Sequence, residues 1–207
     1  FLLLNFDTVY LFFPLFLEDN QADALQSLSH SIDFGSKWAG DYINRGIIYY
    51  RMHNYRSALA DYDKAVSLAP RDAQCYYNRG VLRQELGDYN RALEDFTQAI
   101  NLAPDRIEIY YQRGMVQLQL RQWQDALDDF TTIIQRYPYF LPAYYLSAQA
   151  QTALGQGKQA YQLRQQAYQL EQKKDSIQSL QTNMQVASAQ KVSFAPVLCK
   201  KIRSIPG

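Results

Sequence analysis

Few side chains in this sequence are of types that carry out chemistry. The only histidines are His30 and His53, and neither has a cysteine or carboxylate at the spacing of a metal site. The sequence contains no P-loop, no GxGxxG fingerprint and no nucleophile elbow. The two cysteines, Cys75 and Cys199, form no metal or redox motif. We therefore expect no catalysis, no cofactor and no metal.

Acidic residues gather at Asp125, Asp128 and Asp129, but Asp61 and Asp63 repeat the same theme elsewhere. A solvated acidic face explains this recurrence better than a metal site. The net charge is +1, and basic residues alternate with acidic ones. No strong field would therefore attract nucleic acid or anionic lipid, and we expect no nucleic-acid partner.

One pattern of charge is periodic. Three arginines each precede an aspartate by sixteen residues, in the pairs Arg45 and Asp61, Arg79 and Asp95, and Arg113 and Asp129. Because the spacing recurs, it predicts ion pairs rather than solvated charges. The next corresponding positions hold Ser147 and Leu163, which cannot form such a pair.

These pairs belong to a repeat of 34 residues. Five kinds of position recur at that spacing: Gly46, Gly80 and Gly114; Tyr42, Tyr76, Tyr110 and Tyr144; Ala58, Ala92, Ala126 and Ala160; Tyr62, Phe96 and Phe130; and Pro70, Pro104 and Pro138. The spacing places a small residue on each of two helices where they cross, with an aromatic side chain beside the crossing.

This pattern resembles the tetratricopeptide repeat (TPR) family, which sets a large aromatic, a small residue four positions on, then Ala, an aromatic and Pro. Asn-Arg-Gly at 44–46 and 78–80, and Gln-Arg-Gly at 112–114, resemble a style common in bacterial members. The resemblance implies an all-α fold, a right-handed α-solenoid of antiparallel helix pairs. The repeats are expected at 39–72, 73–106, 107–140 and, more weakly, 141–174.

Within a repeat we expect two helices, here called helix A and helix B. In 73–106 the pattern predicts helix A from Ala73 to Leu86 and helix B from Tyr89 to Leu102. Gly87 and Asp88 supply the turn and a helix N-cap. The stretch from Asp105 to Glu108 fits a capping box. His53 and Arg121 replace the turn glycine in their repeats, so strained or differently shaped turns are expected there.

The ends of the chain fit the repeat less well. Residues 1–38 are expected to hold an apolar segment, Phe1–Leu17, and a degenerate partial repeat whose helix is Asn20–Ile32. Phe1–Leu17 has three interpretations: an element packed on the array, the end of a preceding domain, or a cut-off membrane segment. Residues 175–190 predict a capping helix, and residues 191–207 a flexible tail. The chain does not begin with Met, so cytoplasmic, periplasmic and membrane-associated locations all stay open.

In TPR arrays the helices A line a concave wall that binds ligands, so the resemblance implies the contact positions. We call these positions the helix A wall, and the predicted partner-binding residues on it are Ile43, Ile47, Tyr77, Asn78, Val81, Tyr111, Met115 and Tyr145. Tyr77, Tyr111 and Tyr145 form a second ladder beside the first tyrosine ladder. Alternatively, these tyrosines pack between repeats. One TPR subclass clamps a C-terminal carboxylate, but only Asn78 matches its pattern here.

The sequence thus predicts a scaffold that binds a peptide or partner protein in the concave groove. Two alternatives remain open. The chain could be a structural module that self-associates through Phe1–Leu17 and the ends of the array. It could also be an accessory fragment of a larger, membrane-associated assembly.

Overall fold

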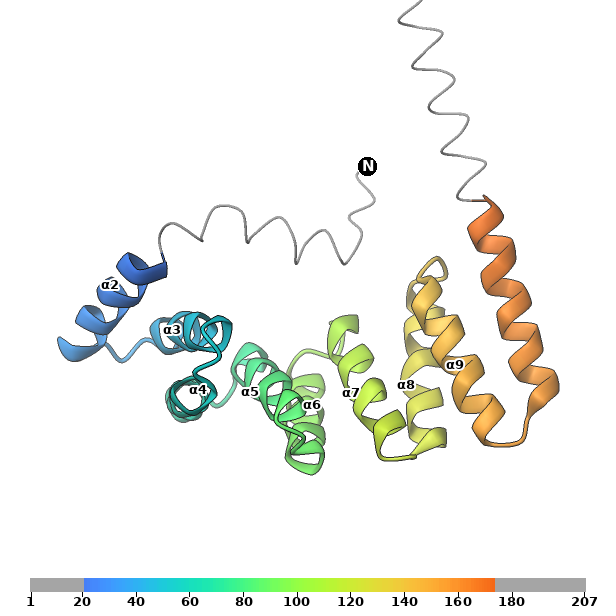
Figure 1. Ribbon diagram of the computed structural model, residues 1–207, viewed down its shortest axis with the longest axis horizontal. Coiled ribbons are helices and arrows are strands. Elements are labelled where there is room, and N and C mark those ends of the chain that lie inside the picture. The colour runs from blue at the N-terminus through green and yellow to red at the C-terminus, as the bar shows by residue number, and fades with distance from the viewer. Residues whose placement is uncertain (1–20, 174–207) are drawn as a thin grey trace, which may run out of the picture. The chain divides into compact units, whose positions relative to one another are not determined.

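The computed structural model describes residues 21–173, and this part of the chain contains helices and turns but no strand (Figure 1). The helices in chain order are α2 (Gln21–Asp33), α3 (Ala39–Arg51), α4 (Tyr55–Leu68), α5 (Ala73–Glu85), α6 (Tyr89–Leu102), α7 (Ile107–Gln119), α8 (Trp123–Arg136) and α9 (Leu141–Ala153). A last helix covers residues 157–173. The predicted segments Phe1–Leu17, 175–190 and 191–207 lie outside the described residues.

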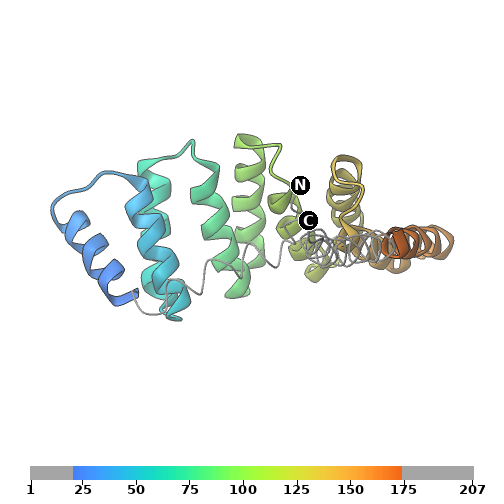
Figure 2. The same cartoon turned by 90° about the horizontal axis from the view of Figure 1, so that it is seen from above.

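The chain divides into two compact units, one that ends at Ile133 and one that begins at Ile134. In the first unit, consecutive helices form hairpins, and each hairpin packs on the next through α4 and α5 and through α6 and α7. Helix α2 packs on α3 and so extends the array upstream, as the sequence predicts. Figure 2 shows these helices from blue to green running side by side. The prediction of an all-α helical-repeat solenoid is confirmed.

Small residues lie where the two helices of a hairpin cross. A Cβ atom placed on Gly80 would come within 2.9 Å of the Phe96 ring, and one on Gly114 within 2.8 Å of the Phe130 ring. Ala92 is fully buried on the opposing helix. The recurring glycines therefore allow the aromatic side chains to lie against the backbone of helix A.

The turns between helices A and B keep one backbone shape despite their different residues. Gly87 and Gly155 adopt φ of 77° and 76°, and His53 and Arg121 adopt 57° and 59°. A left-handed conformation is strained for residues with a side chain. The expected strain at His53 and Arg121 is therefore present within an unchanged turn.

The predicted capping box before α7 is wrong. The N-cap residue is Arg106 and no side chain caps the helix. Instead of reaching back to the backbone, the Glu108 carboxylate accepts a hydrogen bond from the Arg106 guanidinium at 2.5 Å. Asp88 does occupy the N-cap position of α6, but it makes no side-chain capping bond.

The second unit contains α9 and the helix of residues 157–173. Alanines dominate the packing of this hairpin: Ala148, Ala160 and Ala167 are at most 2% exposed. Throughout residues 21–173, no helix is both long and apolar enough to cross a membrane.

Candidate functional site

The predicted ion pairs form in all three hairpins of the first unit. The guanidiniums of Arg45, Arg79 and Arg113 each bond both carboxylate oxygens of Asp61, Asp95 and Asp129, with shortest N–O distances of 2.7 Å. The three aspartate side chains are only 3–7% exposed. Such two-point contacts fix the relative orientation of helices A and B.

Each arginine also reaches back to the preceding helix B, which the sequence reasoning missed. Nη1 of Arg79 donates to Oδ1 of Asp63 at 2.8 Å. Arg45 and Arg113 make longer bonds to the Ser29 and Thr97 hydroxyls, at 3.4 and 3.3 Å. The signal was available, because polar residues recur at the 34-residue spacing at these three positions. One arginine per repeat therefore links its own hairpin to the previous one.

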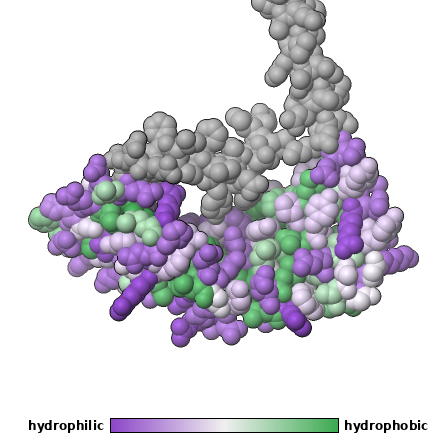
Figure 3. Space-filling view, viewed as in Figure 1, coloured by the Kyte–Doolittle hydropathy of each residue, from purple (hydrophilic) through white to green (hydrophobic). Residues whose placement is uncertain are grey.

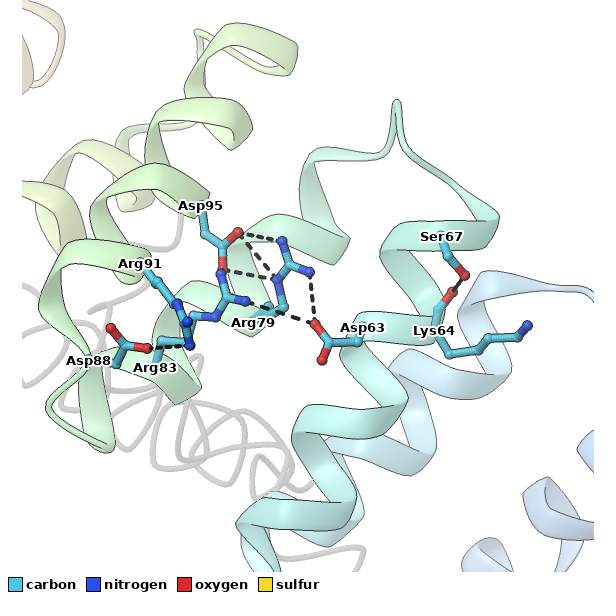
Figure 4. A network of polar contacts seen from close by, with 8 residues as sticks. All are labelled: Asp63, Lys64, Ser67, Arg79, Arg83, Asp88, Arg91 and Asp95. Atoms are coloured by element: carbon cyan, nitrogen blue, oxygen red, sulfur yellow. Dashed lines mark hydrogen bonds and ion pairs between the residues drawn. The ribbon is translucent and has the colours of Figure 1, made fainter.

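The link is most elaborate between α4, α5 and α6, where Figure 4 shows the polar network. Arg83 adds a second guanidinium, 2.8 Å from Oδ2 of Asp95, so that two arginines enclose one carboxylate. Burial disfavours the charge of Arg79, but the hydrogen bonds and charges of Asp95 and Asp63 outweigh it and raise the pKa of Arg79.

In the third hairpin, burial and hydrogen bonding have opposing effects on the pKa values of the pair Arg113 and Asp129. The hydrogen bonds that Arg113 donates to Asp129 raise the pKa of Arg113. Burial raises the pKa of the Asp129 carboxyl, while its bond to Arg113 opposes the rise. Because its charge is costly in this buried position, Asp129 depends strongly on its arginine.

We call the recurring contact between the helix A arginine and the helix B aspartate the charged seam. It is absent from the second unit, as the sequence predicts. Ser147 takes the arginine position, is fully buried, and its Oγ has no hydrogen-bond partner in the described structure. Leu163 takes the aspartate position and is half-buried. Because neither residue is charged, the crossing of α9 with the helix of residues 157–173 is mainly apolar.

The predicted partner-binding residues differ in how accessible they are. Ile43 is 7% exposed and belongs to a core cluster with Ala65 and Cys75. Tyr77 is 6% exposed, and its ring lies 6.2 Å from that of Phe96. At these two positions the side chains contribute packing. The ring contacts of Tyr77, with Phe96 and Arg106, lie within its own repeat.

The remaining predicted residues are more accessible. Half-buried side chains on the helix A wall of the first unit are Ile47, Asn78, Val81, Tyr111 and Met115. Tyr145, in the second unit, is 45% exposed. The second tyrosine ladder thus passes from buried at Tyr77 to half-buried at Tyr111 and exposed at Tyr145.

A polar chain crosses the wall between α5 and α7. Arg106 stacks on the ring of Tyr77 at 5.4 Å and donates through Nη1 to Oε1 of Gln74 at 2.9 Å. Nε2 of Gln74 then donates to Oδ1 of Asn78 at 2.8 Å. Because a guanidinium only donates, it fixes the orientation of both amides. The chain ends in Nδ2 of Asn78, a buried donor with no hydrogen-bond partner in the described structure.

An open pocket lies beside the loops around Pro70 and Ala103, and Arg71, Asp72 and Arg106 are among the residues that line it. No group of three or more potential metal ligands occurs within residues 21–173. The face seen in Figure 3 is largely hydrophilic, with separate apolar patches.

Two family models match the sequence. Both describe a tetratricopeptide repeat, one over residues 46–110 and the other over residues 108–138. Residues 46–138 of the chain therefore carry tetratricopeptide repeats. This confirms the resemblance on which the expected repeats rest, and the architecture is that of a scaffold for protein contacts.

Solved TPR structures share the fold of this TPR protein. The crystal structure of MamA aligns with a TM-score of 0.72 at 20% identity, over 77% of this chain and 93% of MamA. The structure of YrrB, described as "a TPR protein with an unusual peptide-binding site", aligns with a TM-score of 0.67 at 20% identity, over 73% of this chain and 78% of YrrB. No curated protein sequence matches the chain.

Proposed function

We propose that this TPR protein binds an extended peptide, or a segment of a partner protein, along the helix A wall of its first unit. The observation that carries the proposal is the polar chain that ends at Nδ2 of Asn78. A buried donor without a partner costs roughly 1–3 kcal/mol. A main-chain carbonyl of a bound peptide would satisfy it once the half-buried Asn78 side chain turned outward to meet the ligand.

The surroundings of Asn78 favour an uncharged acceptor over a carboxylate. Arg106 is the nearest cation in the polar chain, and Glu108 already neutralises it. Val81 and Met115 lie further along α5 and α7 and are half-buried. Together these groups suit a peptide that presents main-chain oxygens and apolar side chains.

Related structures are consistent with this function. YrrB is described as having a peptide-binding site. The Naa15/Naa10 structure, described as bound to HypK-THB, aligns over 72% of this chain but only 22% of its own chain, with a TM-score of 0.59 at 15% identity. For the present chain, a protein or peptide partner is inferred from the shared fold and from the accessible part of the wall.

The test is selection from a displayed random-peptide library, followed by calorimetry with the selected peptide. Val81→Asp combined with Met115→Asp should weaken binding at least tenfold, because both changes place charge on the wall. Leu102→Asp is the matched control, since Leu102 is 39% exposed on a helix B, and it should leave affinity unchanged. Equal affinity of all three proteins would contradict the proposal.

Asn78→Asp sharpens the test, because it replaces the donor by a charged acceptor of the same size. We expect it to weaken binding of the same peptide while Asn44→Asp, at the corresponding exposed position of α3, has little effect. Circular dichroism of each variant checks that the helices are intact. An affinity that Asn78→Asp leaves unchanged would remove Asn78 from the site.

A further inference from the structure

Helix α2 is a helix B whose own helix A is not among the described residues. It begins at Gln21, 34 residues before Tyr55, where α4 begins, and it packs on α3 as α4 packs on α5. Figure 2 shows it as the blue end of the array. One face of α2 therefore lacks the kind of neighbour that α3 is for α4 and α5 is for α6.

The face of helix B that meets its own helix A is closed in α4 and open in α2. In α4, four residues on this face are at most 5% exposed: Ala58, Asp61, Tyr62 and Ala65. The corresponding residues of α2 are Ala24, Ser27, Leu28 and Ser31. None of these four is buried, and Ser27 and Ser31 are exposed. The apolar side chains of Ala24 and Leu28 therefore lack the cover that the same positions have in the next hairpin.

The stretch directly before α2 has the length that is needed to close this face. In the described hairpins, a helix A and its turn occupy Ala39–Asn54 before α4 and Ala73–Asp88 before α6. The corresponding stretch before α2 is residues 5–20. Because it is joined to α2 without a linker, its effective concentration at the face far exceeds that of a separate molecule.

The composition of Phe1–Leu17 suits a covered position. The segment contains only one charged side chain, and most of its residues are apolar. The positions that correspond to Arg45 and Asp61 hold Leu11 and Ser27, so no half of the charged seam would be left without a partner. Placing such a segment against the apolar part of α2 removes apolar surface of both from water.

The segment does not repeat helix A residue for residue. Phe12 stands at the glycine position, and Pro14 stands at the position of Ile48. Opposite the glycine position, α2 has Leu28 where the next hairpins have Tyr or Phe, so a larger side chain on one side would meet a smaller one on the other. Covering the face requires apolar side chains at this place and not a regular helix.

We propose that Phe1–Leu17 covers the open face of α2 within the same chain and thereby completes the first hairpin of the array. A terminal repeat must shield its apolar face from water, and this segment would do so here. The cover does not depend on ligand binding at the helix A wall, and it goes beyond that function. It also withdraws Phe1–Leu17 from self-association.

The rate at which a maleimide labels single cysteines tests the proposal. In a Cys199→Ser background of the full chain, Ser27→Cys on the open face should react about tenfold more slowly than Gln26→Cys on the outer face of α2. Both residues are exposed on α2, so the two rates should be equal unless the preceding segment covers position 27. The buried Cys75 is accounted for by labelling the Cys199→Ser protein alone.

Aspartates in the segment show whether it is the cover. Phe12→Asp combined with Phe13→Asp should raise the labelling rate at position 27 about tenfold, because the charges would release the segment from an apolar face. The matched control is Met52→Asp with Leu86→Asp, two turn residues that are 52% and 49% exposed. It should leave the slow rate unchanged.

Sedimentation velocity at about 1 µM and about 100 µM separates cover within one chain from cover by a second copy. The account predicts a monomer that is labelled equally slowly at both concentrations. Three results would overturn the proposal. They are equal rates at positions 26 and 27; a slow rate that the aspartates of the segment leave unchanged; and protection that occurs only in a dimer that these aspartates dissociate, since the segment would then cover the second copy.

Discussion

The three hairpins that begin with α3, α5 and α7 and the last hairpin follow one repeat, but they are held together by different interactions. In the first three, an arginine on helix A bonds an aspartate on its own helix B and a polar residue on the previous one. In the last, buried Ser147 and half-buried Leu163 occupy the arginine and aspartate positions.

The difference shows what the charged seam adds to a repeat. Apolar packing alone is enough for a hairpin, because the last one forms without the seam. A buried ion pair contributes little net stability compared with apolar residues of similar size, but it accepts only one geometry. We infer that the seam fixes the orientation of successive helices A, and thereby the shape of the helix A wall.

The largest effect is expected when the seam is broken on one side. Arg113→Ala should destabilise the protein by about 3 kcal/mol, because it leaves the buried Asp129 carboxylate without its partner. Urea unfolding measures the loss. Arg113→Ser combined with Asp129→Leu copies the last hairpin and should recover most of it. If the double variant were as unstable as Arg113→Ala, the unpaired Asp129 carboxylate would not be the cause of the loss.

The same variant predicts a dependence on pH. Burial already raises the pKa of Asp129 in the wild type, and losing Arg113 removes the opposing contribution. A carboxyl whose folded pKa lies above its unfolded value disfavours folding at high pH and does so less as pH falls through the folded pKa. The deficit of Arg113→Ala should therefore shrink between pH 7 and pH 4, and the double variant should show no such change.

Overpacking the crossing should cost somewhat less. Ala92→Leu should destabilise the first unit by about 2 kcal/mol, because Ala92 is fully buried and leaves no room for a larger side chain. Ala160→Leu, at the corresponding position of the last hairpin, should cost less, since exposed Arg164 replaces the aromatic there. Ala60→Leu, on the exposed side of α4, is the control for helix propensity. If all three variants had the same midpoint of thermal unfolding, Ala92 would not lie at a tightly packed helix crossing.

The turns give a smaller effect. Arg121 holds a left-handed φ of 59° where the last hairpin uses Gly155 at 76°. Arg121→Gly should therefore raise stability by about 0.5–1 kcal/mol, and Gly155→Ala should lower it by a similar amount. Chemical denaturation midpoints report both. A loss on Arg121→Gly would show that the arginine side chain matters more than the backbone strain.

The smallest effect is expected at Ser147. Its buried hydroxyl has no hydrogen-bond partner in the described structure, so Ser147→Ala should change stability by less than about 1 kcal/mol, in the stabilising direction. The experiment compares this small change in stability with the large loss expected for Arg113→Ala at the corresponding position of the third hairpin. A large loss would mean that the hydroxyl has a bonding role after all.

Much of this fold could be read from the sequence because the repeat determines it. The glycine, alanine and aromatic ladders predicted where the helices cross, and the sixteen-residue spacing predicted the ion pairs. The bond from Arg79 to Asp63 was not predicted, although it spans sixteen residues like the pair with Asp95. Asp63 lies in the preceding hairpin, and only a comparison of all repeats shows that a polar residue recurs at its position.

The candidate site was less predictable, because one register position has different surroundings in different repeats. Tyr77 is buried under Arg106 while Tyr145 is exposed, although the sequence treats them alike. The same arginine displaced the expected capping box before α7. A side chain that is long enough to stack on one residue and bond two others changes its surroundings in ways that periodicity cannot express.

Hydrogen exchange measured by mass spectrometry on the full chain tests the central claim most directly, namely that the charged seams make the first hairpins a rigid platform. The account predicts that amides of α5, α6 and α7 exchange slowly and together, and that those of α9 and residues 157–173 exchange faster. Arg113→Ala should accelerate exchange in α7. Protection that is equal in the two regions, or higher in the last hairpin, would contradict the account.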